Sequence, residues 1–221
     1  MQPGATSFMT MRNARAIARL AMGALALLTV GSLPALAHHP MGGAQVTTFG
    51  QGLLSGLGHP VIGLDHLAFL LAFGAVAALF GGGARAIAAF MVASFAGVVL
   101  HLAHIGVAYV EPALAVTVMA AGLLLVTGGV RAGLPVFVLA AAGGVLHGYA
   151  LAESIVGVEA TPLAAYLIGL TCIQTTLMTA AMLVARALFS SPATGNQRAR
   201  WTGGAVCLAG VYFLAAAVAG A

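Results

Sequence analysis

Apolar residues fill this chain in long segments that are separated by short stretches of Gly, Pro, Arg and Glu. Six of these segments follow residue 60, and each has about the twenty residues that a helix needs to cross a hydrocarbon core of ~30 Å. The expected spans are Val61–Phe80, Ala84–Ala108, Pro112–Val130, Leu134–Ala152, Pro162–Phe189 and Trp201–Ala219. The pattern predicts an all-α integral membrane protein, with a six-helix transmembrane domain over residues 59–221.

The N-terminus predicts a cleaved signal peptide over residues 1–37. Its positively charged start carries Arg12, Arg15 and Arg19. A short apolar stretch follows at Leu20–Val30, and Ala35-Leu36-Ala37 has the small-x-small pattern of a signal peptidase site. The alternative is an uncleaved first transmembrane helix, although this apolar stretch is short for a span.

Residues 38–58 are expected to form a periplasmic segment with a short interfacial or re-entrant helix. Its apolar positions at helical spacing are Phe49, Leu53, Leu54 and Leu57. Gly56, Gly58 and Pro60 are expected to end this helix before the first span. Cleavage after Ala37 would place His38 and His39 at the mature N-terminus, as either a weak divalent-metal site or a disordered end.

The composition supports a membrane protein and excludes an ordinary soluble domain. The chain is 62% hydrophobic and 5% charged, with a mean hydropathy of +1.09, whereas soluble domains have about 25% charged residues. The pI of about 9.7 comes from arginines that are spread between the apolar segments rather than gathered in one patch, so nucleic acid is not an expected partner. The apolar composition makes the lipid bilayer the expected partner. Cys172 and Cys207 lie in apolar segments and are expected to be small core residues rather than to form a disulfide.

The charged residues predict the orientation of the spans. A cleaved signal leaves the mature N-terminus outside the cytoplasm, and six spans then put both termini in the periplasm of a bacterial inner membrane. The arginines expected on the cytoplasmic side are Arg85, Arg131, Arg186, Arg198 and Arg200, and the acids expected outside are Glu111, Glu153 and Glu159. This distribution obeys the positive-inside rule.

Several ionisable side chains are expected at one depth, in the outer half of the membrane. They are His59, Asp65 and His66 in the first span, His101 and His104 in the second, and His147 and Glu153 in the fourth. His59 and His66 are two helical turns apart and would share a face if the helix continues through Pro60. His101 and His104 are three residues apart and would also share a face. Such groups cost about 2.5–3.5 kcal/mol each in a bilayer, so their clustering indicates a functional site.

Imidazole and carboxylate groups together are ligands of Ni²⁺, Co²⁺, Zn²⁺ or Mn²⁺, and no thiolate is expected beside them. All of these side chains are therefore candidate metal ligands. The alternative for each histidine is a packed, hydrogen-bonded residue, and Asp65-His66 could act as a polar clamp between helices. Deeper in the fifth span, the polar stretch Thr171–Thr179, with Gln174 near its middle, predicts either a path inward or hydrogen bonds between helices.

The histidine pattern resembles the signatures of the HupE/UreJ family. His59, five residues and then Asp65-His66 match the first signature, and Pro60, Gly63 and Gly74 are also in place. The second signature is similar to the stretch from His147 to Glu153, except that Leu151 and Ala152 stand where the family has His and Gly. The resemblance extends over essentially the whole chain.

The resemblance implies a six-helix permease for Ni²⁺ or Co²⁺ that supplies hydrogenase or urease maturation proteins. It implies no permanently bound cofactor and no catalytic residues. The entry ligands would be His59, Asp65 and His66, with His147 and Glu153 completing the site and His101 and His104 as further candidates.

Two other functions remain open from the sequence. One is a b-haem electron-transfer protein with His101 and His147 as axial ligands. The other is a metal-binding accessory protein that does not transport. A G-x-x-x-x-G-K-[ST] motif is not found, so uptake is expected to use the membrane potential, an ion gradient or a partner rather than bound ATP.

Overall fold

The computed structural model describes residues 46–80, 82–128 and 133–220. These residues belong to one compact unit, Ala35–Ala221. The expected signal peptide over residues 1–37 and the histidines His38 and His39 lie outside the described residues.

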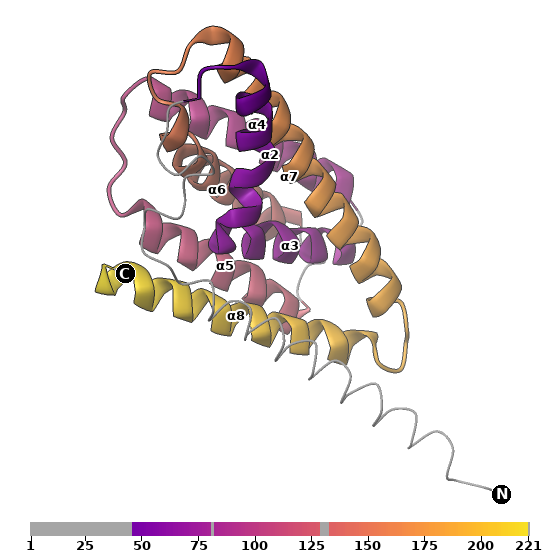
Figure 1. Cartoon of the computed structure of the whole chain (residues 1–221). Helices are drawn as coiled ribbons and strands as arrows, with labels where there is room; N and C mark the ends of the chain where they lie inside the picture. The colour runs from indigo at the N-terminus through magenta and orange to yellow at the C-terminus, as the bar shows by residue number, and fades with distance from the viewer. Residues whose placement is uncertain (1–45, 81, 129–132, 221) are drawn as a thin grey trace, which may run out of the picture. The chain divides into compact units, whose positions relative to one another are not determined.

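The described residues form helices and connecting loops (Figure 1). The helices are α2 (Phe49–Ile62), α3 (Leu64–Leu79), α4 (Gly83–Leu102), α5 (Val110–Thr127), α6 (Gly133–Leu151), α7 (Ala160–Phe189) and α8 (Gly195–Ala219), with a short 3-10 helix, η2 (Glu153–Ile155), before α7. Within this part of the chain, the five helices from α4 to α8 are each long and apolar enough to cross a membrane. The helices α2 and α3 meet this standard only as a pair bent by 77°, which gives six spans if the pair is one broken span. The prediction of an all-α protein with several membrane spans is confirmed.

The prediction that Gly56, Gly58 and Pro60 would end the first helix is wrong. A capping box between Thr48 and Gln51 starts α2, and the helix continues through Pro60 to Ile62. The reason is packing, because added side-chain atoms at the buried glycines of α2 would collide with the backbone of α7. Contact between two helix backbones stabilises a helix that local propensity alone would interrupt.

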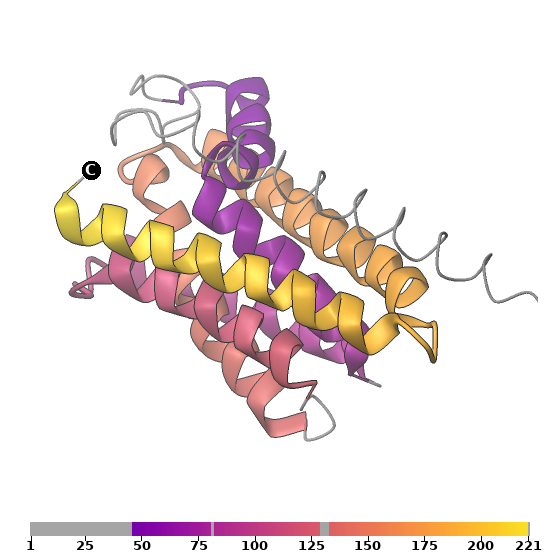
Figure 2. The ribbon, with the colours of Figure 1, turned by 90° about the horizontal axis from the view of Figure 1, so that it is seen from below.

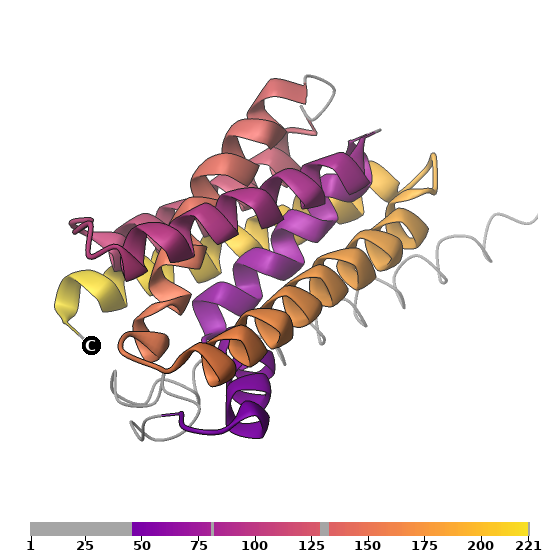
Figure 3. The ribbon, with the colours of Figure 1, turned by 90° about the horizontal axis from the view of Figure 1, so that it is seen from above.

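The helix α3 lies in the middle of the bundle. It packs on α7 and α5 and also contacts α4, α6 and α8, and Figures 2 and 3 show it passing between the other helices. Its residues Ala72–Ala77 are all buried. A helix that is apolar on every side is expected in such a central position.

The helices around α3 associate in close pairs. The strongest pairings are α4 with α6, α5 with α8, and α2 with α7. Glycines allow the close approach of α4 and α6, since a Cβ at Gly144 or Gly148 would collide with the backbone around Phe90 or Ser94. Small residues serve this purpose in lipid, where burial of apolar surface does not drive helices together.

Candidate functional site

The break between α2 and α3 occurs at Gly63, which has φ −71° and ψ 98°. Its N–H donates to the His59 carbonyl at 3.0 Å, and its carbonyl accepts from Leu67 N at 2.9 Å, so each side of the break retains a backbone hydrogen bond. A Cβ on Gly63 would lie 2.7 Å from Cδ2 of His66. Glycine at this position therefore lets the His66 ring pack against the turn.

Three buried histidines meet beside this break. His59 comes from α2, His66 from α3 and His147 from α6, and they are 5%, 5% and 1% exposed. The ring centroids of His59 and His66 are 6.2 Å apart, and those of His66 and His147 are 5.0 Å apart. The expectation that His59 and His66 share a face of one continuous helix is wrong, because the bend at Gly63 separates them. The bend nevertheless brings the two rings together.

His147 is held by polar and ring contacts with three neighbouring residues. Its Nδ1 lies 2.7 Å from Nδ1 of His66, and its Nε2 lies 3.0 Å from Oγ1 of Thr117. The Phe69 ring stacks on the imidazole with centroids 4.2 Å apart. Two hydrogen bonds and one stacking contact therefore determine the orientation of this ring.

His59 has polar partners from α7 and from the segment after α6. Its Nδ1 lies 2.8 Å from the hydroxyl of Tyr166 and 3.2 Å from Oγ of Ser154. The Tyr166 hydroxyl in turn donates to the Leu151 carbonyl at 2.5 Å. Leu151, which stands where the family signature has a second histidine, has a fully buried side chain and takes part in the site through its backbone.

Asp65 is the acidic member of the cluster. It lies in the first turn of α3, is half-buried, and its Oδ1 accepts from the backbone N–H of His66 at 2.8 Å. The first N–H groups of a helix have no partner within the helix, and a carboxylate at this end is favoured by the helix dipole. Asp65 therefore stabilises the start of α3 and places a negative charge beside the histidines.

Sequence reasoning missed Thr117, Tyr166 and Ser154. A Ser or Thr hydroxyl often bonds to nearby backbone, and a Tyr commonly packs in a core, so these residue types carry no signal by themselves. Their place in the site becomes visible only when α5, α7 and η2 are packed against α2 and α6.

The other predicted ligands are not brought into contact with the three histidines. Glu153 is exposed at the start of η2. His101 packs against the ring of Tyr149, with centroids 4.4 Å apart, and its Nδ1 has no hydrogen-bond partner among the described residues. His104 is exposed, with φ 58°. The expected shared face of His101 and His104 does not form, because α4 ends at Leu102.

The polar stretch of the fifth expected span turns mostly away from the helix bundle. Its exposed members include Thr171, Cys172, Thr175 and Thr176. The expectation that Cys172 is a core residue is therefore wrong, because this side of α7 faces away from the bundle. Gln174 points inward and is 1% exposed, and its Oε1 accepts from Ser94 Oγ at 3.4 Å. Its Nε2 has no hydrogen-bond partner among the described residues. The stretch therefore supplies one buried amide rather than a continuous polar row.

The spacing of the imidazoles can be compared with that of metal-bound imidazoles. A metal–nitrogen bond is about 2.1 Å long and the ring centre lies about 1.1 Å behind the nitrogen, so two rings that share an ion have centroids within about 6.4 Å. Both neighbouring pairs, at 6.2 and 5.0 Å, fall within this limit. Within the described part of the chain, however, no three His, Cys, Asp or Glu side chains are placed to hold one ion together. The cluster is a row of imidazoles rather than a closed coordination cage.

The haem alternative does not fit this geometry. Both nitrogens of His147 are hydrogen-bonded within the protein and one face of its ring is covered by Phe69. An axial ligand needs a free lone pair directed at the iron. The second expected axial ligand, His101, packs instead against Tyr149.

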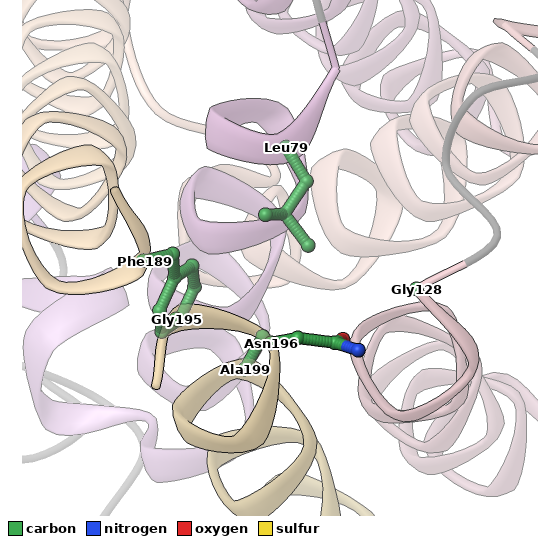
Figure 4. A pocket seen from close by; sticks show the side chains of 6 residues that line it. All are labelled: Leu79, Gly128, Phe189, Gly195, Asn196 and Ala199. Atoms are coloured by element: carbon green, nitrogen blue, oxygen red, sulfur yellow. The ribbon is translucent and has the colours of Figure 1, made fainter. Parts of the chain in front are cut away.

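A separate cavity of about 230 Å³ lies beside Leu79, the last residue of α3, and none of the clustered histidines lines it (Figure 4). It is lined by Leu79, Gly128, Phe189, Gly195, Asn196 and Ala199. Among the described residues, the only polar side chain in this lining is the amide of Asn196, so these residues offer the cavity no ionisable ligand for a metal.

The fold and the site define a class of protein: a helical protein with several membrane spans, in which a broken helix and three buried histidines from separate helices form a polar centre. The family model described as "HupE / UreJ protein" matches residues 25–213, and the chain belongs to this family. The curated protein named "Protein HupE" from Rhizobium leguminosarum bv. viciae is 40% identical over 95 residues, which are 42% of this chain and 47% of that protein. No solved structure matches the chain.

Proposed function

We propose that this protein is a membrane permease that takes up a divalent transition metal ion, with Ni²⁺ as the preferred cargo and Co²⁺ as a second one. The observation that carries the proposal is the bend at Gly63, which gathers the buried His59, His66 and His147 beside Asp65. Membership of the HupE/UreJ family supports the same function.

The energetic cost of the arrangement supports a transport site. Ionisable side chains inside a membrane cost about 2.5–3.5 kcal/mol each, and backbone that leaves the helix at membrane depth is tolerated where it is buried or lines a wet cavity. Broken helices near the middle of transporters commonly carry the substrate site, since helix ends present partial charges to the ion. The C-terminal end of α2 directs the negative end of its dipole to the break, where a cation is favoured.

The kind of donor supports a metal of borderline softness. Imidazole nitrogens with one carboxylate suit Ni²⁺, Co²⁺ or Zn²⁺ better than Mg²⁺ or Ca²⁺, which prefer oxygen ligands. An open row of imidazoles also suits transport, because a permeation site must release the ion that it captures.

The proposed path runs from the end of the bundle that holds η2 towards the C-terminal end of α3. Glu153 is exposed one residue before Ser154, whose hydroxyl contacts His59, so Glu153 would attract the ion from the periplasm. His59, Asp65 and His66 would bind it next, and the buried amide of Gln174 would assist its passage deeper in the bundle. A divalent ion that moves inward gains about 4.6 kcal/mol per 100 mV, twice the value for a single charge, which allows accumulation without ATP.

The proposed setting is the bacterial inner membrane, with the histidine cluster on the periplasmic side and both termini of the mature chain in the periplasm. The imported ion would supply the maturation proteins of a hydrogenase or a urease. The function is transport rather than catalysis.

The test is uptake of radiolabelled Ni²⁺ and Co²⁺ by cells that produce the wild type, Asp65→Asn, His66→Ala or the control His104→Ala, at equal amounts in the membrane. We expect uptake by the first two variants to fall at least tenfold, and uptake by His104→Ala to stay close to wild type because His104 is exposed outside the cluster. Undiminished uptake in both Asp65→Asn and His66→Ala would refute the assignment of these residues to the transport site. Metal binding without uptake by the wild type would indicate an accessory protein instead of a permease.

A further inference from the structure

We propose that Phe69, Phe73 and Phe90 form the inner gate of the ion path, a closed apolar barrier on the cytoplasmic side of the histidine cluster. The inference rests on the proposed function for the direction of transport and the identity of the ion. The barrier itself can be tested without Ni²⁺ or Co²⁺, so the gate and the proposed function can fail separately.

Two of the three rings continue the face of α3 that carries His66. Phe69 and Phe73 follow His66 by three and seven residues, and a helix places residues at these spacings on one face. The third ring, Phe90, comes from α4. All three phenylalanines are 0% exposed. An ion that leaves the cluster along this face of α3 therefore reaches the three rings next.

The three rings meet at one point. The ring centroids of Phe69 and Phe73 are 5.7 Å apart, and the ring centroid of Phe90 lies 5.6 Å from the first and 5.7 Å from the second. Because the three distances are nearly equal, the rings form a triangle rather than a row. The Phe69 ring also stacks on His147 at 4.2 Å, and a Cβ at Gly143 would collide with it. The inner gate is therefore in direct contact with the histidine cluster.

The helices that surround the gate offer the ion no polar side chain farther inward. Residues 67–79 of α3 are all apolar, and so are residues 133–146 of α6. The hydrogen-bonded pair of Ser94 and Gln174 lies on the cluster side of the gate, because Ser94 is one turn after Phe90 in the outward direction of α4. A charge is costly in apolar surroundings, and an apolar constriction excludes water and ions. The gate is therefore closed to a hydrated ion in this structure.

The packing of the helices provides a way to open the gate. The strongest pairing of α4 is with α6, whereas α3 packs mainly on α7 and α5. Phe90 on α4 therefore belongs to a different packing group from Phe69 and Phe73 on α3, and a small shift between the two helices separates the rings. Shifts of packed helices against each other are a common form of conformational change. Entry of an ion into the inner half of the bundle requires this separation.

Phe73 offers the cleanest variants, since Phe69 also stacks on His147. Phe73→Ala removes one ring of the gate, and Phe73→Leu keeps apolar bulk at the same position. Leu125→Ala is the matched control, because Leu125 is also 0% exposed but lies on α5 beside Gly203 of α8. Both alanine variants create a cavity, so both are expected to lower the melting temperature.

The test is leakage of H⁺ and Na⁺ into liposomes that contain the purified full chain and no transition metal, followed with trapped fluorescent dyes. We expect Phe73→Ala to leak at least tenfold faster than the wild type, and Phe73→Leu and Leu125→Ala to remain close to the wild type. A Phe73→Ala protein that melts at a lower temperature but leaks no faster would show that the rings are only a packed core. Equal leakage in Leu125→Ala would also overturn the proposal. If Phe73→Ala does not fold, Phe90→Ala replaces it with the same expected results.

The same liposomes separate the gate from the proposed function. Wild-type liposomes that take up neither Ni²⁺ nor Co²⁺, together with a leaking Phe73→Ala, would refute the metal permease and leave the barrier established. Uptake of Ni²⁺ by the wild type, together with a Phe73→Ala protein that does not leak, would support the permease and refute the gate.

Discussion

The contact between α4 and α6 offers a sharp test of how packing positions the cluster. Gly148 directly follows His147, and a Cβ at Gly148 would lie 2.7 Å from the carbonyl carbon and Cα of Ser94, with a closer collision against the Ser94 carbonyl oxygen. Normal carbon–carbon contacts are about 3.5–4.0 Å. The substitution Gly148→Ala must therefore move α6 from α4 by about 1 Å at this crossing.

A displacement of this size has two consequences. Overpacking of a tight contact costs about 1–3 kcal/mol, so we expect Gly148→Ala to lower the melting temperature in detergent by several degrees. The bond from His147 to His66 is 2.7 Å long, and a shift of about 1 Å would stretch it beyond the range in which a hydrogen bond forms. Metal uptake should therefore fall by at least tenfold.

Two glycines of α8 provide matched controls for this test. A Cβ at Gly203 would lie 2.7 Å from the backbone nitrogen of Val126 on α5, whereas a Cβ at Gly204 would meet nothing within 4 Å. We expect Gly203→Ala to lower the melting temperature without changing metal uptake, and Gly204→Ala to change neither. A Gly148→Ala protein with wild-type melting temperature and uptake would refute the packing argument. Equal loss of metal uptake in Gly148→Ala and Gly203→Ala would show that the effect is not specific to the cluster.

Three further predictions concern residues around the cluster. Gln174→Leu should leave the melting temperature unchanged or raise it, because it removes a buried amide whose Nε2 has no hydrogen-bond partner among the described residues. The same substitution should slow metal uptake, and unchanged uptake would exclude Gln174 from the transport path. His104→Gly should raise the free energy of unfolding by about 1 kcal/mol, because glycine adopts the positive φ of this position without strain, and a lower stability in chemical denaturation would contradict this. Cys172→Ser should leave both metal uptake and melting temperature within error of the wild type, because Cys172 is exposed and forms no disulfide. Reduced uptake would indicate a role for the thiol.

The residues most readily predicted from the sequence were those that are costly in a membrane. His59, Asp65, His66 and His147 stand out in apolar segments, and the structure gathers them at one point. Their burial follows from the same cost, since an ionisable group avoids lipid by facing the interior of the bundle.

The bend between α2 and α3 could not be placed from local sequence. Gly58, Pro60 and Gly63 are all helix breakers, and the choice among them depends on which backbone groups are supported by α7 and by the His66 ring. Such long-range contacts override local propensity. The ends of helices are similarly uncertain, which is why His104 was expected on a helix that stops at Leu102.

The hydrogen-bond partners of the histidines also cannot be predicted from the sequence. Thr117 and Tyr166 lie in largely apolar parts of their helices, and their role depends on how α5 and α7 are rotated against α6 and α2. Helical periodicity cannot supply this rotation when nearly every side of a helix is apolar.

Transport by the purified protein is the most direct test of the proposed permease. The wild type, Asp65→Asn and His104→Ala would be reconstituted into liposomes with an imposed inside-negative potential, and radiolabelled Ni²⁺ would be added outside. We expect potential-dependent accumulation by the wild type and by His104→Ala, and uptake by Asp65→Asn no faster than in protein-free liposomes. Wild-type liposomes that take up Ni²⁺ and Co²⁺ no faster than protein-free ones would contradict the proposal.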